Sequence, residues 1–113
     1  MKSIEQFIKE RERLNEQTLK FADKNIKRFF SVDATTYEAG ALDKKTKELL
    51  GLCASMVLRC DDCIKYHLIE AHKAGVQDDE LSETFSIALL VGGSIVIPHL
   101  RRAVEAWGEI KTL

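Results

Sequence analysis

The chain has 113 residues, of which 45% are hydrophobic, and its 17 basic and 18 acidic side chains leave a formal net charge of −1 at pH 7. This is the size of one ordinary domain, with enough apolar residues to build a core. No block of basic residues stands apart from acidic neighbours, which argues against a surface for nucleic acid or anionic membranes. We therefore expect a single domain over residues 1–113.

The first residues, the longest apolar run and the cysteines indicate the cellular compartment of the protein. The first residues are charged and periodic and do not read as a signal peptide. The longest weakly polar stretch, Phe85 to Pro98, is too short to cross a bilayer. Three cysteines without a signal peptide argue against a secreted disulfide framework. We expect a soluble, cytoplasmic protein whose paired cysteines are redox-active or metal-bound.

Helical spacing recurs along the whole chain and β-type alternation is almost absent, which predicts an all-α fold. Residues 3 to about 30 are expected to form one long amphipathic helix, because Phe7, Leu14 and Phe21 recur at seven-residue spacing opposite a charged face. Residues 31–40 are expected to form a connection.

Two helices are predicted in the middle of the chain. Asp43 can cap the first, from about 44 to 58. Residues 59–62 break it and begin the second, which runs to Ala74, and Gly75 is a natural left-handed C-cap. The inward face of the first is expected to comprise Leu49, Leu50, Leu52, Cys53, Met56 and Val57.

Two further helices complete the prediction. Asp78 or Asp79 caps the first of them, and the pair Gly92-Gly93 interrupts it. The last helix spans about 95 to 110, and its true start lies near Val96 or Ile97 because Pro98 fits only in a first turn. The first of these helices is expected to bury Leu81, Phe85, Ala88, Leu89 and Leu90, and the last to carry Ile95, Ile97, Leu100, Ala103, Val104 and Trp107.

The run from Phe85 to Pro98 is apolar on nearly all sides. A helix of that kind must be covered all round, and a chain of 113 residues has little material for the purpose. We therefore expect the protein to be a homo-oligomer.

The chemistry concentrates between Cys60 and His67. Cys60 and Cys63 lie three residues apart and His67 follows four residues later, which places all three side chains on one helical face. A helix that starts near Cys60 offers that thiol free N–H groups and a favourable dipole, both of which stabilise a thiolate. His67 can take the proton of Cys63 directly or through a water molecule.

The same atoms are compatible with a structural metal site. The run from Cys60 to His67 offers three ligands, with Cys53 or Glu48 as a fourth. Structural zinc sites usually draw a second ligand pair from a distant segment, whereas His72 and His99 are isolated in the sequence. Cys53 is otherwise expected to be a small core residue.

The two acids between the cysteines have opposing effects. Asp61 and Asp62 are first-turn carboxylates that favour a helix start, but they oppose a thiolate at short range. Arg59 partly offsets them. The sequence leaves the sign of the net effect open.

Glu48 lies twelve residues before Cys60, and the order Glu48, Cys60, Cys63, His67 resembles the carboxymuconolactone decarboxylase-like superfamily, specifically its AhpD-like alkylhydroperoxidase branch. The resemblance covers roughly residues 20 to 113. It implies an all-helical domain with the Cys-x-x-Cys at the start of a central helix. It also implies a homo-oligomer, commonly a hexamer built as a trimer of dimers.

The resemblance implies a role for each of the four residues. Cys63 would attack a hydroperoxide, Cys60 would resolve the product as a disulfide, and Glu48 with His67 would relay protons for Cys63. An external dithiol of lipoyl or thioredoxin type would regenerate the pair, and a peroxiredoxin is a further candidate partner. No cofactor and no metal are expected for this chemistry.

One departure from the family pattern leaves an alternative open. The best-known AhpD-type proteins carry a histidine next to the second cysteine, where this chain has Asp62. A dithiol electron carrier or redox sensor with little peroxidase activity therefore remains the alternative, with the metal module as a third. Lactone decarboxylation is disfavoured, because that branch of the superfamily lacks the cysteine pair.

Overall fold

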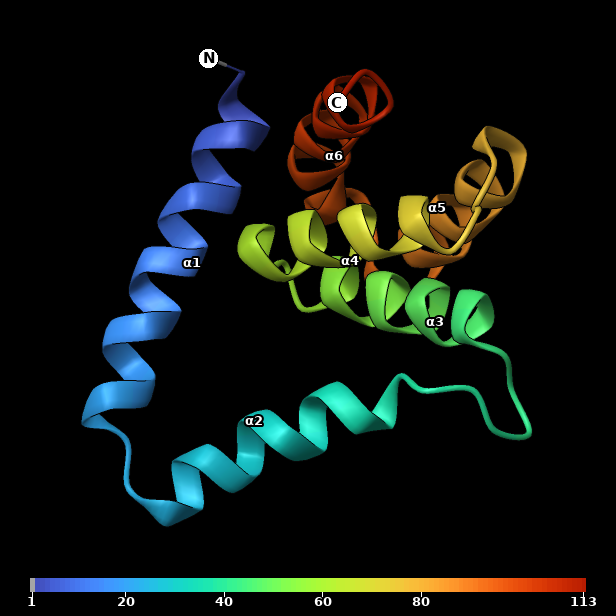
Figure 1. Ribbon diagram of the computed structural model, residues 1–113. Coiled ribbons are helices and arrows are strands. Elements are labelled where there is room, and N and C mark those ends of the chain that lie inside the picture. Colours follow the sequence, from blue (N-terminus) through green and yellow to red (C-terminus); the bar gives the residue numbers. More distant parts are fainter. Residues whose placement is uncertain (1) are drawn as a thin grey trace.

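The computed structural model describes residues 2–113, and over that range all the regular secondary structure is helical (Figure 1). This confirms the all-α prediction. The elements in chain order are α1 (Ser3–Phe21), α2 (Lys24–Thr36), α3 (Lys44–Val57), α4 (Asp61–Lys73), α5 (Asp78–Gly92), a short 3₁₀ helix (Ser94–Val96) and α6 (Ile97–Ile110).

The first two helices correct the sequence prediction of a single long helix. The backbone is extended at Ala22 and Asp23, and the Asp23 carboxylate accepts a hydrogen bond from Ile26 N–H at 3.0 Å. Aspartate is a strong N-cap, so it starts a new helix at a position where apolar periodicity alone predicts continuation. The new helix continues to Thr36, so most of the expected connection at 31–40 is helical as well.

The other predicted boundaries are close to the observed ones. Asp43 caps α3 by accepting from Thr46 N–H at 2.7 Å, as predicted. Gly75 follows α4 with a φ of 87°, which favours glycine. The N-cap of α5 is Gln77 rather than either aspartate, because Glu80 reaches back to accept from Gln77 N–H at 2.9 Å. Pro98 lies in the first turn of α6, where it was expected.

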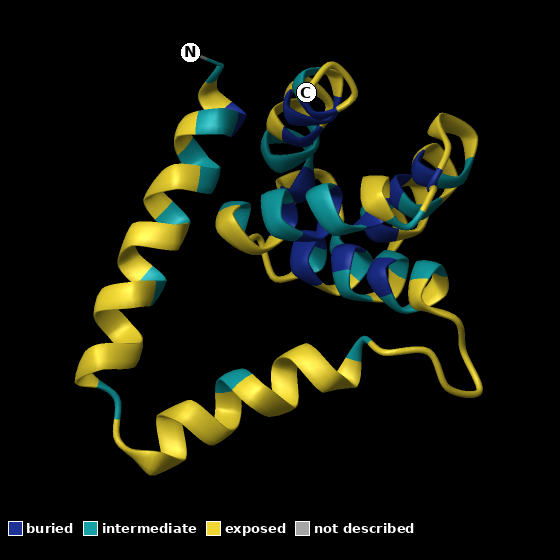
Figure 2. Ribbon diagram, viewed as in Figure 1, coloured by how far each residue is buried: buried dark blue, intermediate teal, exposed yellow. Residues whose placement is uncertain are grey.

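The hydrophobic core lies among α3, α4, α5 and α6, which form a bundle (Figures 1 and 2). α3 packs against α4 and α5, and α4 packs against α6. Two predicted core positions are wrong: Leu50 is 55% exposed and Leu90 is 85% exposed. Each lies on the helix face turned away from the bundle, since a helix in this position can bury only one stripe. Leu52, Met56, Ile64, Leu68, Ala88 and Val96 are fully enclosed.

Helices α1 and α2 form an arm that leaves the bundle and returns to it (Figure 1). The arm is largely exposed, as Figure 2 shows, and its first turn is held by Ile4, which is buried against the bundle. Within residues 2–113, none of the helices combines the length and apolar character needed to span a membrane.

A single chain leaves several large apolar side chains uncovered. Phe29 on α2 is 73% exposed, and four large hydrophobic residues of the run at 85–98 are more than half exposed. Those four are Ile87, Leu90, Val91 and Ile95. The expectation that this run needs cover from another chain stays a prediction.

Candidate active site

The two cysteines lie where α3 ends and α4 begins. Arg59 adopts a positive φ of 59°, a left-handed conformation that costs a non-glycine residue about 1 kcal/mol and reverses the chain. Cys60 then serves as the N-cap of α4, and its sulfur accepts from Cys63 N–H at 3.3 Å. The predicted break within 59–62 is therefore confirmed.

Cys60 and Cys63 form a disulfide, with their Cα atoms 5.3 Å apart. Cys63 is exposed, whereas Cys60 is half-buried. A reactant from solvent thus reaches Cys63 more easily than Cys60. Cys53, the remaining cysteine, is free and packs against the core as predicted, and burial raises the pKa of its thiol.

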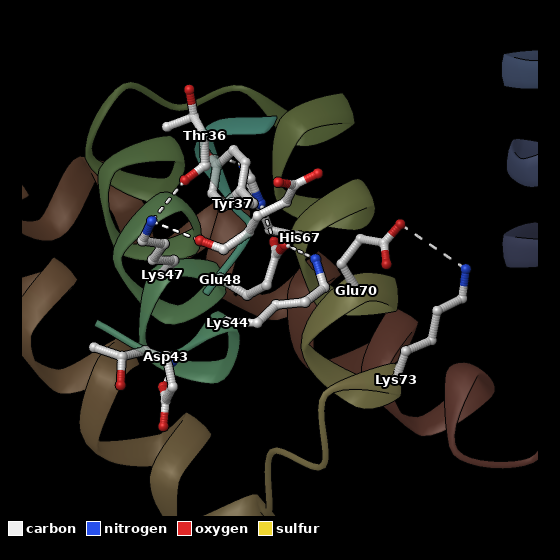
Figure 3. Close-up of polar contacts among 11 residues, drawn as sticks. Thr36, Tyr37, Asp43, Lys44, Lys47, Glu48, His67, Glu70 and Lys73 are labelled. Carbon is white, nitrogen blue, oxygen red and sulfur yellow. Dashed lines mark hydrogen bonds and ion pairs between the residues drawn. The ribbon is translucent and has the colours of Figure 1, made fainter. Parts of the chain in front are cut away.

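Glu48 on α3 and His67 on α4, the helix that begins at the cysteines, form a buried pair (Figure 3). Glu48 is 0% exposed and His67 is 7% exposed, and His67 Nδ1 lies 2.8 Å from Glu48 Oε1. The second carboxylate oxygen of Glu48 accepts from Lys44 Nζ at 3.1 Å. A buried carboxylate is costly unless it is paired, and here both oxygens have partners.

The pair fixes the chemistry of the imidazole. An ionised carboxylate only accepts hydrogen bonds, so the Nδ1 of His67 carries the proton that Glu48 accepts. Nε2 is then the nitrogen that can gain and lose a proton. Within residues 2–113, the hydrogen-bond partners of the imidazole are Glu48 and Tyr37, and neither cysteine sulfur is one of them.

Tyr37 is the site residue that the sequence reasoning missed. It follows α2, in the segment expected to be a plain connection, and its Oη lies 3.3 Å from His67 Nε2. Burial, followed by the charges of Asp33 and Glu48, raises the pKa of its phenol. No spacing rule relates position 37 to position 67, so no local signal in the sequence could have found this contact.

Asp61 is tied to α6 through His99, which is isolated in the sequence but has a partner in the fold. Asp61 Oδ1 lies 2.9 Å from His99 Nδ1, and Arg102 Nη2 lies 3.0 Å from Asp61 Oδ2. Burial alone would raise the pKa of Asp61, but hydrogen bonds from His99 and Arg102 outweigh it and hold that pKa below its ordinary value. The cation that pairs with Asp61 is therefore Arg102 rather than Arg59.

Asp62, the other acid between the cysteines, is exposed. The two acids, which the sequence alone does not distinguish, therefore have different surroundings. The charge of Asp61 is offset by α6, and that of Asp62 faces solvent next to the exposed Cys63.

The alternative metal module receives no geometric support. Within the described residues 2–113, no three His, Cys, Asp or Glu side chains converge in a way that could hold a metal ion. The donors expected to share a metal are otherwise engaged: the two sulfurs with each other and His67 with Glu48.

Comparisons with known proteins agree with this arrangement. The family model for the carboxymuconolactone decarboxylase family matches residues 25–106. An uncharacterised protein encoded in the cox locus of Paracoccus denitrificans is 27% identical over 82 residues, which are 73% of this chain and 74% of that protein.

Solved structures extend the likeness to nearly the whole chain. A crystal structure of TM1620 from Thermotoga maritima is 54% identical and superposes with a TM-score of 0.93, covering 95% of this chain and 94% of that one. A second crystal structure of TM1620 describes it as a carboxymuconolactone decarboxylase family protein with a possible involvement in antioxidative response.

A family member from Legionella pneumophila, in its apo form, is 28% identical with a TM-score of 0.87, over 95% of this chain and 96% of that one. The family model covers well over half of the chain, and the fold and sequence of the solved relatives agree with it. The chain belongs to the carboxymuconolactone decarboxylase family.

Proposed function

We propose that this protein is an AhpD-like thiol peroxidase that reduces hydroperoxides through a dithiol–disulfide cycle of Cys60 and Cys63. The observation that carries the proposal is the disulfide at the start of α4, one helical turn from the buried Glu48–His67 pair. A reversible thiol pair next to a proton acceptor is the equipment that peroxide reduction by thiols requires. The antioxidative role suggested for the Thermotoga relative points the same way.

The first step would form the sulfenate. His67, held by Glu48, accepts the thiol proton of Cys63, and the thiolate attacks the distal oxygen of a hydroperoxide. The O–O bond breaks, Cys63 becomes a sulfenic acid, and the alkoxide leaves as an alcohol once it takes back the proton. The exposure of Cys63 favours it over Cys60 for this attack.

The second step would close the disulfide. The Cys60 thiolate attacks the Cys63 sulfur and displaces hydroxide, which leaves as water after protonation. The N–H group of Cys63 points at the Cys60 sulfur and would stabilise its thiolate. In sum, two thiols and one hydroperoxide give one disulfide, one alcohol and one water.

The cycle needs a reductant, and we infer a dithiol of lipoyl or thioredoxin type that returns both cysteines to thiols. A peroxiredoxin could receive or supply electrons at the same pair. The reaction itself takes place on sulfur and needs no cofactor. We place the protein in the cytoplasm, where reducing conditions keep such a pair turning over.

We also propose that the working form is a homo-oligomer, with a hexamer built as a trimer of dimers as the expected assembly. The support is the set of large apolar side chains that one chain leaves exposed on α2 and α5. Exposed apolar surface of this extent is typical of protein interfaces.

Substitution of single cysteines tests the proposal. Reduced protein should consume an organic hydroperoxide, Cys63→Ser should abolish turnover, and Cys60→Ser should stop after one turnover with a sulfenic acid on Cys63. Cys53→Ser is the matched control, because Cys53 lies away from the motif and packs against the core. Full activity in Cys63→Ser would show that the roles are assigned wrongly.

A second candidate function is a dithiol carrier or redox sensor with little peroxidase activity. The observation in its favour is the exposed carboxylate of Asp62 beside Cys63, which opposes the build-up of negative charge on that sulfur. Thiol–disulfide exchange with a partner dithiol, in protein that consumes no hydroperoxide, would select this candidate.

A further inference from the structure

The nitrogen of His67 that can exchange protons faces a tyrosine. Nδ1 is committed to Glu48 at 2.8 Å, and the Oη of Tyr37 lies 3.3 Å from Nε2 (Figure 3). The ring of Tyr66 also lies against the imidazole, with the centroids 5.2 Å apart, but within residues 2–113 its hydroxyl has no hydrogen bond to His67. Of the two tyrosines, Tyr37 is therefore the one whose hydroxyl is a hydrogen-bond partner of Nε2.

Tyr37 is held in this place by the end of α2. Lys47 on α3 donates to the carbonyl oxygen of Thr36 at 2.9 Å (Figure 3). It also donates to that of Glu38 at 2.7 Å, so the two contacts lie on either side of Tyr37. A cation at a helix C-terminus satisfies carbonyls that have no partner in the helix. No residue of α2 is buried, so the two contacts of Lys47 hold the end of this helix, and with it the phenol, next to α3.

The space for the contact is provided by Gly51 on α3. A Cβ at this position would lie 2.7 Å from Tyr37 Oη and 2.8 Å from His67 Cε1. Both distances are shorter than atoms tolerate without a shift. The backbone of α3 thus leaves room for the phenol and the imidazole to meet.

The hydroxyl of Tyr37 can serve both states of the imidazole. A phenol donates to a neutral nitrogen and accepts from a protonated one, without a change in position. Because burial raises its pKa, the phenol stays protonated at neutral pH. Tyr37 is half-buried while Glu48 and His67 are buried, so it joins the enclosed pair to the outside.

We propose that Tyr37 is a positioning residue that acts through His67, holding the imidazole and passing protons to and from Nε2 during the thiol chemistry of Cys63. This rests on the proposed function. In the oxidation step the hydroxyl gives its proton to Nε2 and takes one back from solvent water, which carries the proton released by Cys63. The same path in reverse returns a proton to the alkoxide, so Tyr37 ends the cycle unchanged.

The test compares Tyr37→Phe with Tyr66→Phe, which removes a hydroxyl from the other ring at the same imidazole. Two rates are followed in single turnovers across a pH series: oxidation of the reduced protein by hydroperoxide, and reduction of the Cys60–Cys63 disulfide by a small dithiol. We expect Tyr37→Phe to slow the proton-dependent rates by about tenfold or more. Tyr66→Phe should stay within about twofold, because it keeps the ring that packs at a tilt against the imidazole.

A second experiment separates proton transfer from packing and does not depend on the fold of Tyr37→Phe. Tyr37 is replaced by fluorotyrosines, which keep its shape while the phenol becomes more acidic. If the hydroxyl passes protons, the rates and their pH profile change along the series. Rates that are equal for tyrosine and all the fluorotyrosines, or equal for Tyr37→Phe and the unmodified protein, would overturn the proposal.

The two proposals can fail separately. A protein that consumes no hydroperoxide would refute the peroxidase function, yet reduction of the disulfide by the dithiol still requires protons for the thiolates it releases. In that case the effect of Tyr37 on disulfide reduction alone decides the role of the phenol.

Discussion

Glu48 Oε1 accepts a hydrogen bond from His67 Nδ1 at 2.8 Å, and this contact joins α3 to α4 inside the bundle. It places a charged carboxylate where the side chain has no exposure at all. Burying a carboxylate destabilises the folded state unless hydrogen-bond partners compensate. The effect of Glu48 on stability and its effect on thiol oxidation can both be measured.

Glu48→Gln should lower the free energy of unfolding by about 2–4 kcal/mol, because the amide cannot replace both contacts of the buried carboxylate. It should also slow formation of the disulfide, since Nδ1 of His67 loses its acceptor. Chemical denaturation and stopped-flow oxidation measure the two effects. Glu70→Gln is the matched control: its contact with Lys73 is a 3.9 Å pair on the helix surface, worth no more than about 0.5 kcal/mol.

A second prediction concerns two glycines inside helices. Gly51→Ala should destabilise the protein by about 1–3 kcal/mol, because its Cβ would press on Tyr37 and His67. Gly108→Ala on α6 has nothing within 4 Å of the new Cβ and should be neutral or stabilising by up to about 1 kcal/mol, because alanine is the better helix former. Thermal unfolding of both variants tests this, and equal effects from the two would contradict the crowding seen at Gly51.

The ion pairs of Asp61 predict a dependence of stability on pH. The pKa of Asp61 is lower in the folded state than in the unfolded chain, so its contribution is present above the unfolded value, about 4, and is lost as pH falls through the folded value. Asp61→Asn should therefore cost about 1 kcal/mol or less at neutral pH, a small figure because the side chain is 38% exposed.

The difference between Asp61→Asn and the unmodified protein should begin to shrink below about pH 4, where the unfolded chain takes up the proton, and should vanish once pH falls below the lower pKa that Asp61 has in the folded state. Urea denaturation at pH 7 and in acid measures it, with Asp62→Asn as the control at the neighbouring exposed acid. A difference that stays constant across this range would mean that the pairing with His99 and Arg102 contributes nothing to stability.

The proposed oligomer is tested at α5. Leu90→Glu places a charge on a side chain that is 85% exposed in one chain, so a monomer would tolerate it. If another chain covers this face, the variant should show a lower mass by light scattering after size-exclusion chromatography. Glu83→Lys, an exposed change on the same helix, is the control. A wild-type protein that elutes with the mass of one chain would refute the oligomer.

The sequence predicted those parts of the fold that depend on local rules. Asp43 as a cap, Gly75 as a left-handed residue and Pro98 in a first turn each follow from one residue and its neighbours. The error at the first helix arose because two local rules predict different structures there. Apolar periodicity predicted continuity through Ala22, and the capping carboxylate of Asp23 ended it.

The candidate site was predictable in part, for the same reason. Helical spacing placed Cys60, Cys63 and His67 on one face, and the resemblance to a family added Glu48. The contacts of Tyr37 with His67 and of Asp61 with His99 span 30 and 38 residues and depend on how the helices pack. No periodicity within one helix reports contacts of that kind.

The most direct test of the account is the thiol state of the protein after it meets hydroperoxide. Fully reduced protein is mixed with one equivalent of an organic hydroperoxide, quenched with an alkylating reagent and digested for mass spectrometry. We predict a disulfide that joins Cys60 to Cys63 and one hydroperoxide consumed for each disulfide. Cys53 should remain a thiol and be recovered in alkylated form. Cys60 and Cys63 both recovered as alkylated thiols, with the hydroperoxide still present, would contradict the account.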